Sequence, residues 1–279
     1  MNTFKKTTLA LAVFTLASGA IAQTAPAPAP APAASPITAN ITITNDYRYR
    51  GISQSNFLPA IQGGFDYAHE SGFYIGNWNS SISWVSDYYG PGGGNGTALG
   101  VTAPVEMDFY AGFKKELIAP GFASDVGVLQ YYYPTSGPVT VNPNTTEIYA
   151  AQNFTLGAVT GFVKFSYAVT NTFGNANSTG SYYPDLTLNY DTGVLGLTLN
   201  GHVGYQHIAG NVSGVSNSSK YSYTDWKLGI TKDFGGGLSG SIAYVGTNAK
   251  KIDNVFQYAS PQSKDLGSAG GLISLTKTF

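Results

Sequence analysis

From Ile37 to the C-terminus, apolar and polar side chains alternate in segments of about ten residues, a length typical of strands that cross a membrane. Neighbouring residues of a β-strand point to opposite faces, so this period of two predicts strands with one apolar and one polar face. The clearest case is residues 105–114, where apolar odd positions alternate with Glu106, Asp108 and Lys114. A wall built from such strands separates an apolar environment from a polar one.

The alternation predicts about twelve strands. Their starts fall near residues 37, 59, 73, 104, 124, 146, 159, 182, 195, 221, 238 and 268. The connections also alternate: those at 69–72, 157–158, 191–193 and 235–237 are tight, and those at 86–103, 134–145, 208–220 and 249–267 are long. An even strand count with short turns at one end and long loops at the other predicts an all-β fold, a transmembrane antiparallel up-and-down β-barrel of the bacterial outer membrane.

The composition excludes several other classes of protein. After the first 22 residues, no apolar run reaches the roughly 20 residues that a membrane-spanning helix needs. Only 10% of the residues are charged, against about 25% in ordinary soluble domains, and a lipid-facing barrel accounts for this shortage. The chain has no Cys, which excludes a disulfide-stapled module and a thiol-ligated metal.

Two segments precede the predicted barrel of residues 36–279. Residues 1–22 have the pattern of a signal peptide, with Lys5 and Lys6 before an apolar stretch and Ala-Ile-Ala at its end. Residues 23–35 alternate Ala and Pro and predict an extended periplasmic spacer, with a partner-binding tether as the alternative. Loss of the two lysines takes the formal charge from −1 to −3, which predicts no nucleic-acid partner.

Aromatic residues gather near both ends of the predicted strands. The topology places five of them at the outer rim, facing lipid: Tyr47, Tyr49, Trp84, Tyr167 and Tyr205. It places six at the inner rim: Tyr67, Phe73, Phe113, Tyr190, Phe234 and Phe279. Such positions are typical of the aromatic girdles of membrane barrels, although aromatic residues are common in strands of every kind.

Three stretches between Ile41 and Trp84 carry a resemblance to a known family. They read DYRYRGISQS at residues 46–55, PAIQGGFDY at 59–67 and HESGFY at 69–74. This part of the chain resembles the start of the TorF-type porins of proteobacteria, which implies an outer-membrane barrel. The ending with Leu275 and Phe279 is similar to the assembly signal of outer-membrane proteins, although Lys277 stands where an aromatic residue is often found. The resemblance therefore implies the barrel-assembly machinery and outer-membrane lipid as partners.

Strand alternation also predicts which charged side chains point into the barrel. The candidate pore-lining residues are Asp46, Arg48, Arg50, Asp66, Glu106, Asp108, Lys114, Lys164, Asp185, His202 and Lys227. Arg48 and Arg50 are predicted on the outer half of the first strand, where they can set a transverse field against Glu106 and Asp108. Two interpretations stay open, because the charges can line a water-filled pore or pair into a network that fills a narrow barrel.

No motif in the chain points to catalysis or to a cofactor. His69 lies in a turn, and His202 and His207 lie on opposite faces of one strand, so none has a local partner for acid–base work. The Gly-rich run at residues 90–96 lacks the Lys-Ser/Thr of a phosphate loop, and Asp253 and Asp265 are too isolated to form a calcium site. We therefore expect no enzyme, cofactor or metal, but a passive channel for small hydrophilic solutes. The alternative is a nonconducting surface barrel whose long loops bind a partner, and a membrane hydrolase ranks third.

Overall fold

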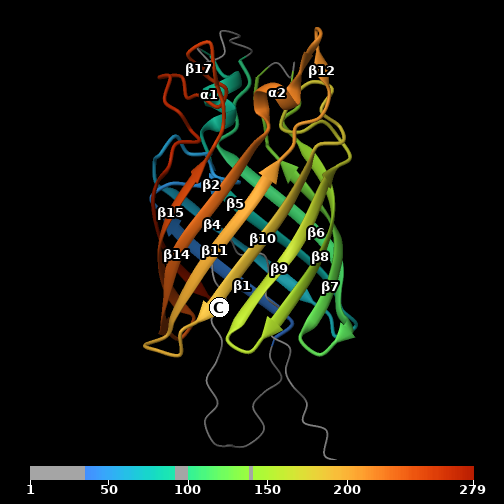
Figure 1. Ribbon diagram of the computed structural model, residues 1–279, viewed down its shortest axis with the longest axis vertical. Coiled ribbons are helices and arrows are strands. Elements are labelled where there is room, and N and C mark those ends of the chain that lie inside the picture. The colour runs from blue at the N-terminus through green and yellow to red at the C-terminus, as the bar shows by residue number, and fades with distance from the viewer. Residues whose placement is uncertain (1–34, 92–99, 138–140) are drawn as a thin grey trace, which may run out of the picture.

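The computed structural model describes residues 35–91, 100–137 and 141–279, and twelve strands of this part of the chain close into one antiparallel barrel (Figure 1). The wall strands are β1 (Ile37–Thr44), β4 (Ala60–Ala68), β5 (Phe73–Ser81), β6 (Val105–Ala119), β7 (Phe122–Tyr132), β8 (Thr145–Leu156), β9 (Val159–Ala168), β10 (Tyr182–Asp191), β11 (Leu197–Gln206), β14 (Tyr223–Gly235), β15 (Leu238–Thr247) and β18 (Gly270–Thr278). Each neighbours the next along the chain, and β1 pairs with β18 to close the wall. The predicted fold class is confirmed, and every predicted start lies within two residues of the observed one.

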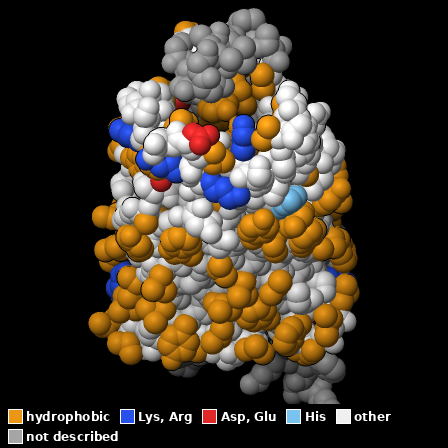
Figure 2. Space-filling view, turned by 45° about the horizontal axis from the view of Figure 1, so that its top comes forward, with side chains coloured by type: hydrophobic (Ala, Val, Ile, Leu, Met, Phe, Trp, Pro, Cys, Tyr) orange, Lys and Arg blue, Asp and Glu red, His pale blue; other side chains and the backbone are white. Residues whose placement is uncertain are grey.

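The outer surface of the wall is apolar, as the alternation predicts. Along β11, for example, Leu199 and Val203 are exposed, whereas Asn200 between them is buried and bonds with Asn189 and Thr231 inside the barrel. Apolar side chains gather in a band around the lower part of the wall in Figure 2, with Lys and Arg side chains above the band on the side of the long loops. This surface suits lipid rather than water.

The two ends of the barrel differ. Tight turns join the strands at one end, near the C-terminus, and long connections extend from the other end (Figure 1). The long connections carry α1 (Trp84–Tyr89), α2 (Asn217–Tyr221) and three small hairpins made by β2 (Arg48–Tyr49) with β3 (Ile52–Ser53), β12 (Asn211–Val212) with β13 (Val215–Ser216), and β16 (Lys251–Ile252) with β17 (Val255–Phe256). Neither helix of the described ranges is long and apolar enough to cross a membrane. The predicted signal peptide and all of the spacer except Ser35 lie outside the described residues.

Most, but not all, of the predicted rim aromatics lie on the outer wall. Tyr167 and Tyr205 are exposed toward the long loops, and Phe73, Phe113, Tyr190, Phe234 and Phe279 are exposed toward the short turns, with Tyr67 half-buried. The prediction was wrong for Trp84, which begins α1 and packs its ring 5.1 Å from that of Tyr133 in a cluster at the barrel mouth. It was also wrong for Tyr47 and Tyr49, which turn inward. All three lie in the connections between wall strands, where the alternation of the wall no longer decides which way a side chain points.

Because one face of the wall meets lipid, a charged side chain at Gly201 is expected to destabilise the barrel. This residue lies at the middle of β11 on the face of Leu199 and Val203, and a Cβ added there meets nothing within 4 Å. We expect Gly201→Arg to unfold more easily than Gly201→Leu by about 2–4 kcal/mol, because only the arginine brings charge to the bilayer midplane. Urea unfolding in lipid vesicles measures the difference. Equal stability of the two variants would place Gly201 on the water side of the wall.

Candidate functional site

The chain leaves the barrel wall after Thr44 and folds into the barrel interior. We call residues 45–59 the inner hairpin, because β2 and β3 pair within it, Arg48 with Ser53 and Tyr49 with Ile52. Arg50 and Gly51 form its turn with φ of 45° and 78°, and two positive φ values are what a tight two-residue hairpin turn requires. The prediction that Arg48 and Arg50 continue the first strand was therefore wrong. Both lie on a hairpin beside the lumen, not on the wall.

Arg50 joins the inner hairpin to the far wall of the barrel. Its Nη2 lies 2.7 Å from Glu147 Oε2 on β8, and its Nη1 donates to Gln206 Oε1 on β11 at 2.5 Å. The guanidinium also lies 4.1 Å from the ring centre of Tyr183. Only 7% of the Arg50 side chain and 2% of the Glu147 side chain are exposed. Burial acts to lower the pKa of Arg50, but the charge and hydrogen bond of Glu147, together with the nearby Tyr49 and Tyr131, raise this pKa overall, so the guanidinium stays charged.

Tyrosine hydroxyls donate hydrogen bonds to several of the interior carboxylates. Glu106 accepts hydrogen bonds from Tyr47 at 2.5 Å and from Tyr133 at 2.6 Å. Burial and the negative charge of Glu106 raise the pKa of both tyrosines, so their hydroxyls stay protonated and donate. Such bonds offset much of the cost of taking a carboxylate out of water.

The same pairing recurs around the interior. Three further carboxylates each accept from a tyrosine hydroxyl: Asp125 from Tyr74, Asp66 from Tyr110, and Asp225 from Tyr183. Tyr74, Tyr110 and Tyr149 pack together and fill the middle of the barrel. Toward the short turns, polar side chains such as Lys114 and Asn153 are only partly buried. The buried carboxylates Glu106, Glu147 and Asp225 lie in the half of the barrel nearer the long loops.

Removing one of these hydroxyls has a predictable cost. We expect Tyr110→Phe to destabilise the barrel by about 1.5–3 kcal/mol, because it leaves the buried Asp66 carboxylate without this donor. Tyr190→Phe is the control, since Tyr190 is exposed on the outer wall. Denaturant unfolding of both variants in the same vesicles gives the comparison. A loss no greater at Tyr110 than at Tyr190 would mean that Asp66 does not depend on this bond.

The structure places all the predicted interior residues inside or at the mouth of the barrel. Asp66, Glu106, Asp108 and Lys164 are buried there, whereas Lys114, Asp185, His202 and Lys227 are half-buried. His202 lies between two carboxylates, 3.0 Å from Asp185 and 3.1 Å from Asp225. That these side chains line a conducting pore stays a prediction.

The arginines of the inner hairpin do not face the acidic residues that were predicted to oppose them. Arg48 pairs with Asp46 beside it, and Arg50 pairs with Glu147, so neither arginine directly opposes Glu106 and Asp108. The pairs follow from the position of the inner hairpin, which carries Arg50 across the lumen to β8.

Sequence reasoning missed two interior carboxylates and the tyrosines that bind the others. Asp125 and Glu147 are 2% exposed, yet the same alternation marks them, because Val126 and Ile148 beside them are exposed on the outer wall. Tyr149 and Tyr183 share the inward parity of Glu147 and Asp185. The alternation indicates that these tyrosines face inward, but it does not reveal that their hydroxyls bind the carboxylates.

Solved structures of outer-membrane proteins share this fold. The NanC porin superposes with a TM-score of 0.52 at 7% sequence identity, covering 87% of this chain and 98% of that one. A KdgM porin, solved in complex with disordered oligogalacturonate, superposes with a TM-score of 0.49 at 7% identity over the same shares of the two chains. At 7% identity the likeness to NanC shows the barrel fold alone.

The sequence itself matches one described family. No curated protein shows significant sequence similarity to the chain. Residues 29–279, which include every strand of the barrel wall, match the family described as bacterial protein of unknown function, Gcw_chp. The chain therefore belongs to the Gcw_chp family.

Proposed function

We propose that the chain is an outer-membrane channel for small hydrophilic solutes, and that the inner hairpin is its constriction. The observation that carries this proposal is the position of Arg50, which reaches from the hairpin across a polar interior to Glu147 and Gln206. A constriction formed by opposed charges sets both the size and the charge of what passes. In this proposal the channel does no covalent chemistry.

Three further observations support the channel. A twelve-stranded barrel is wider than the eight-stranded barrels that side chains fill completely, and narrower than open porins with sixteen strands or more. The stretch Asp46–Ser55, which carries much of the resemblance to TorF-type porins, forms most of the inner hairpin. The NanC neighbour is itself named a porin. The apolar wall and the predicted signal peptide suit the outer membrane, reached through the barrel-assembly machinery.

One observation favours a second candidate, a nonconducting barrel. The carboxylates around the inner hairpin are almost inaccessible to water, with Glu106 and Asp225 each 1% exposed. If the hairpin never moves, the interior is sealed, and the long loops would supply the function as a binding surface. In the channel proposal, by contrast, solutes pass when the hairpin is displaced.

Planar-bilayer recordings of three proteins separate the two candidates. They are the wild type, Arg50→Glu at the constriction, and Lys251→Glu on an exposed loop, and each variant changes the charge by two units. The channel proposal expects single-channel steps in the wild type and a higher cation preference in Arg50→Glu alone. Local charge acts strongly at a constriction, whereas salt screens the loop charge.

The other outcomes are equally definite. A wild type without steps at any voltage would contradict the channel and favour the sealed barrel. Steps whose reversal potential in a salt gradient is the same in the wild type and Arg50→Glu would leave a channel but remove the inner hairpin as its constriction.

A further inference from the structure

The wall is incomplete where its first and last strands meet. The β1–β18 ladder runs from Asn40–Thr278 to Thr44–Ser274, and β1 ends there, whereas β18 begins at Gly270. The side chain of Asn45 continues the ladder: its Nδ2 donates to the Gly271 carbonyl at 3.1 Å, and its Oδ1 accepts from the Ile273 amide at 2.7 Å. Beyond Asn45, β18 has no strand beside it on this edge.

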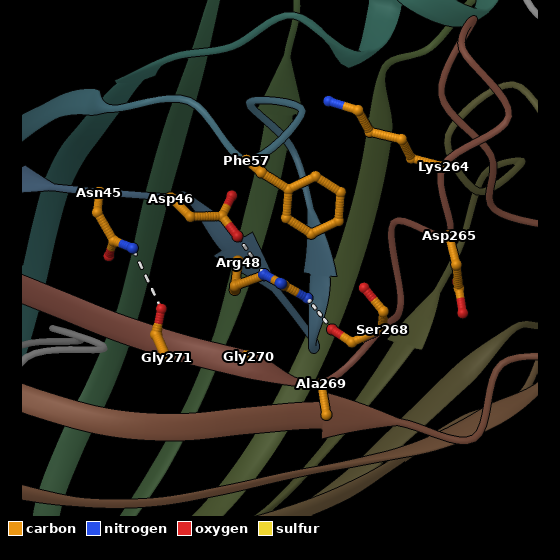
Figure 3. A pocket seen from close by; sticks show the side chains of 10 residues that line it. All are labelled: Asn45, Asp46, Arg48, Phe57, Lys264, Asp265, Ser268, Ala269, Gly270 and Gly271. Atoms are coloured by element: carbon orange, nitrogen blue, oxygen red, sulfur yellow. Dashed lines mark hydrogen bonds and ion pairs between the residues drawn. The ribbon is translucent and has the colours of Figure 1, made fainter.

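A cavity of about 390 Å³ opens at this gap, and we call it the seam notch (Figure 3). Its lining comes from the inner hairpin on one side and from the end of the last loop and the start of β18 on the other. The lining residues are Asn45, Asp46, Arg48, Phe57, Lys264, Asp265, Ser268, Ala269, Gly270 and Gly271.

Arg48 is held rigidly at the back of the notch. Its Nε donates to Asp46, and its Nη1 donates to the carbonyl oxygens of Gly51, Leu266 and Ser268 at 2.8, 3.2 and 3.0 Å. Only 5% of its side chain is exposed. Nη2 makes no hydrogen bond to any residue within the described ranges, and a Cβ added at Gly270 would lie 3.7 Å from it. One donor nitrogen of this largely buried guanidinium is therefore without a partner in the described residues, and Arg48 lines the notch.

The polar groups that line the notch and have no hydrogen-bond partner in the described residues are mainly donors. Besides Arg48 Nη2, they are the ammonium of Lys264, the Ser268 hydroxyl and the Gly271 amide, which points to the same strand edge as the Gly271 carbonyl. The acidic residues are already engaged: Asp46 accepts from Arg48, Ser53 and Ser55, and Asp265 accepts from the Gly267 amide at 2.9 Å. The lining has two cations and two carboxylates, but its groups without a partner are mainly donors, and such donors suit an anionic group with several oxygens.

The position of the notch indicates what carries that group. Asn45, Ala269 and Gly271 open onto the outer face of the wall. The next outward residues toward the bilayer are Ile43 and Ile273, which are 56% and 57% exposed. A recess with cations above an apolar wall lies where lipid headgroups meet acyl chains.

We infer that the seam notch binds the phosphate headgroup of a membrane lipid, with its acyl chains lying along Ile43 and Ile273. Arg48 Nη2 and Lys264 provide the charge, and the Ser268 hydroxyl and the Gly271 amide provide further donors. The bound lipid closes the gap that β1 leaves beside β18. This site is separate from the lumen and does not depend on whether the barrel conducts.

The test uses the folded full-length mature protein in dodecyl maltoside micelles. The probe is dilauroyl phosphatidic acid, and the two comparison compounds are dilauroylglycerol, which has the same chains without phosphate, and inorganic phosphate. Native mass spectrometry counts the retained lipid, and the temperature at which the barrel loses its folded electrophoretic mobility reports stabilisation. We expect one phosphatidic acid per wild-type chain with a raised unfolding temperature, and neither effect from the comparison compounds.

Two variants place negative charge in the notch. Gly270→Asp sets a carboxylate beside Arg48 Nη2, and Lys264→Glu reverses the exposed cation, so each is expected to weaken retention at least tenfold. Lys251→Glu makes the same charge change as Lys264→Glu on the β16–β17 hairpin of the same connection, but outside the residues that line the notch, and it should bind as the wild type does. Because Lys264 lies on an exposed loop, its variant stays informative if Gly270→Asp fails to fold.

Three results would overturn the inference. Equal retention of dilauroylglycerol would mean that only the apolar wall binds. An equal effect of inorganic phosphate would assign the notch to a soluble anion. Unchanged retention of phosphatidic acid in both notch variants would place the lipid elsewhere on the wall.

Discussion

A chain that lacks residues 271–279 is expected to form no barrel at all. β18 pairs with β15 from Leu238–Lys277 to Val245–Gly270 and with β1 from Asn40–Thr278 to Thr44–Ser274. Its loss leaves two strand edges whose amides and carbonyls have no partner in lipid, where each unsatisfied group costs several kcal/mol. Outer-membrane fractionation with a heat-modifiability assay measures the result, and we expect no folded protein.

The matched control removes residues 251–256, which form the small β16–β17 hairpin outside the wall. This deletion spares every wall strand, so the folded form should persist in the outer-membrane fraction. Recovery of folded protein from the chain without residues 271–279, in amounts like those of the control, would contradict closure through β18.

Glu147→Gln is expected to release the inner hairpin. It leaves the buried charge of Arg50 without its ion-pair partner, and breaking a buried pair in this way costs about 3–5 kcal/mol. If the lost free energy destabilises the docked hairpin and not the barrel wall, the population of undocked hairpin rises by roughly two to three orders of magnitude. Each 1.4 kcal/mol is a factor of ten in the equilibrium constant. Limited proteolysis at residues 48–57 reports undocking of the hairpin, and denaturant unfolding reports the stability of the whole barrel.

A double-mutant cycle with Arg50→Gln isolates the pair. The double variant removes both charges, so it should lose less stability than the two single variants added together. Lys251→Gln on an exposed loop should change stability by no more than about 0.5 kcal/mol. Strictly additive losses in the cycle would show that Arg50 and Glu147 do not depend on each other.

The wall could be predicted from the sequence almost strand by strand, and the reason is physical. Lipid and the barrel interior impose opposite demands on alternate residues, so the pattern at residues 105–114 or around Leu199 and Asn200 reports the face directly. The face that a residue takes can therefore be predicted without knowing which strands lie beside it. The tight turns and long loops then order the strands.

The inner hairpin could not be predicted in this way. Asp46, Arg48 and Arg50 alternate with Tyr47 and Tyr49 as a strand does, but β1 ends at Thr44. The residue pair Arg50-Gly51 carried the only local hint, because glycine readily adopts the positive φ of a tight turn. Where the hairpin docks depends on partners such as Glu147 and Gln206, which lie far along the chain.

The contacts of Arg48 also order the events of folding. Its Nη1 bonds carbonyl oxygens of residues that lie 218 and 220 positions further along the chain, next to β18. Contacts between such distant segments form only after the chain between them has been organised, because closing so long a loop costs entropy before any contact repays it. We therefore expect the inner hairpin to dock after the last strand has met the first. In that order the wall would close around water first, and the docking hairpin would displace it.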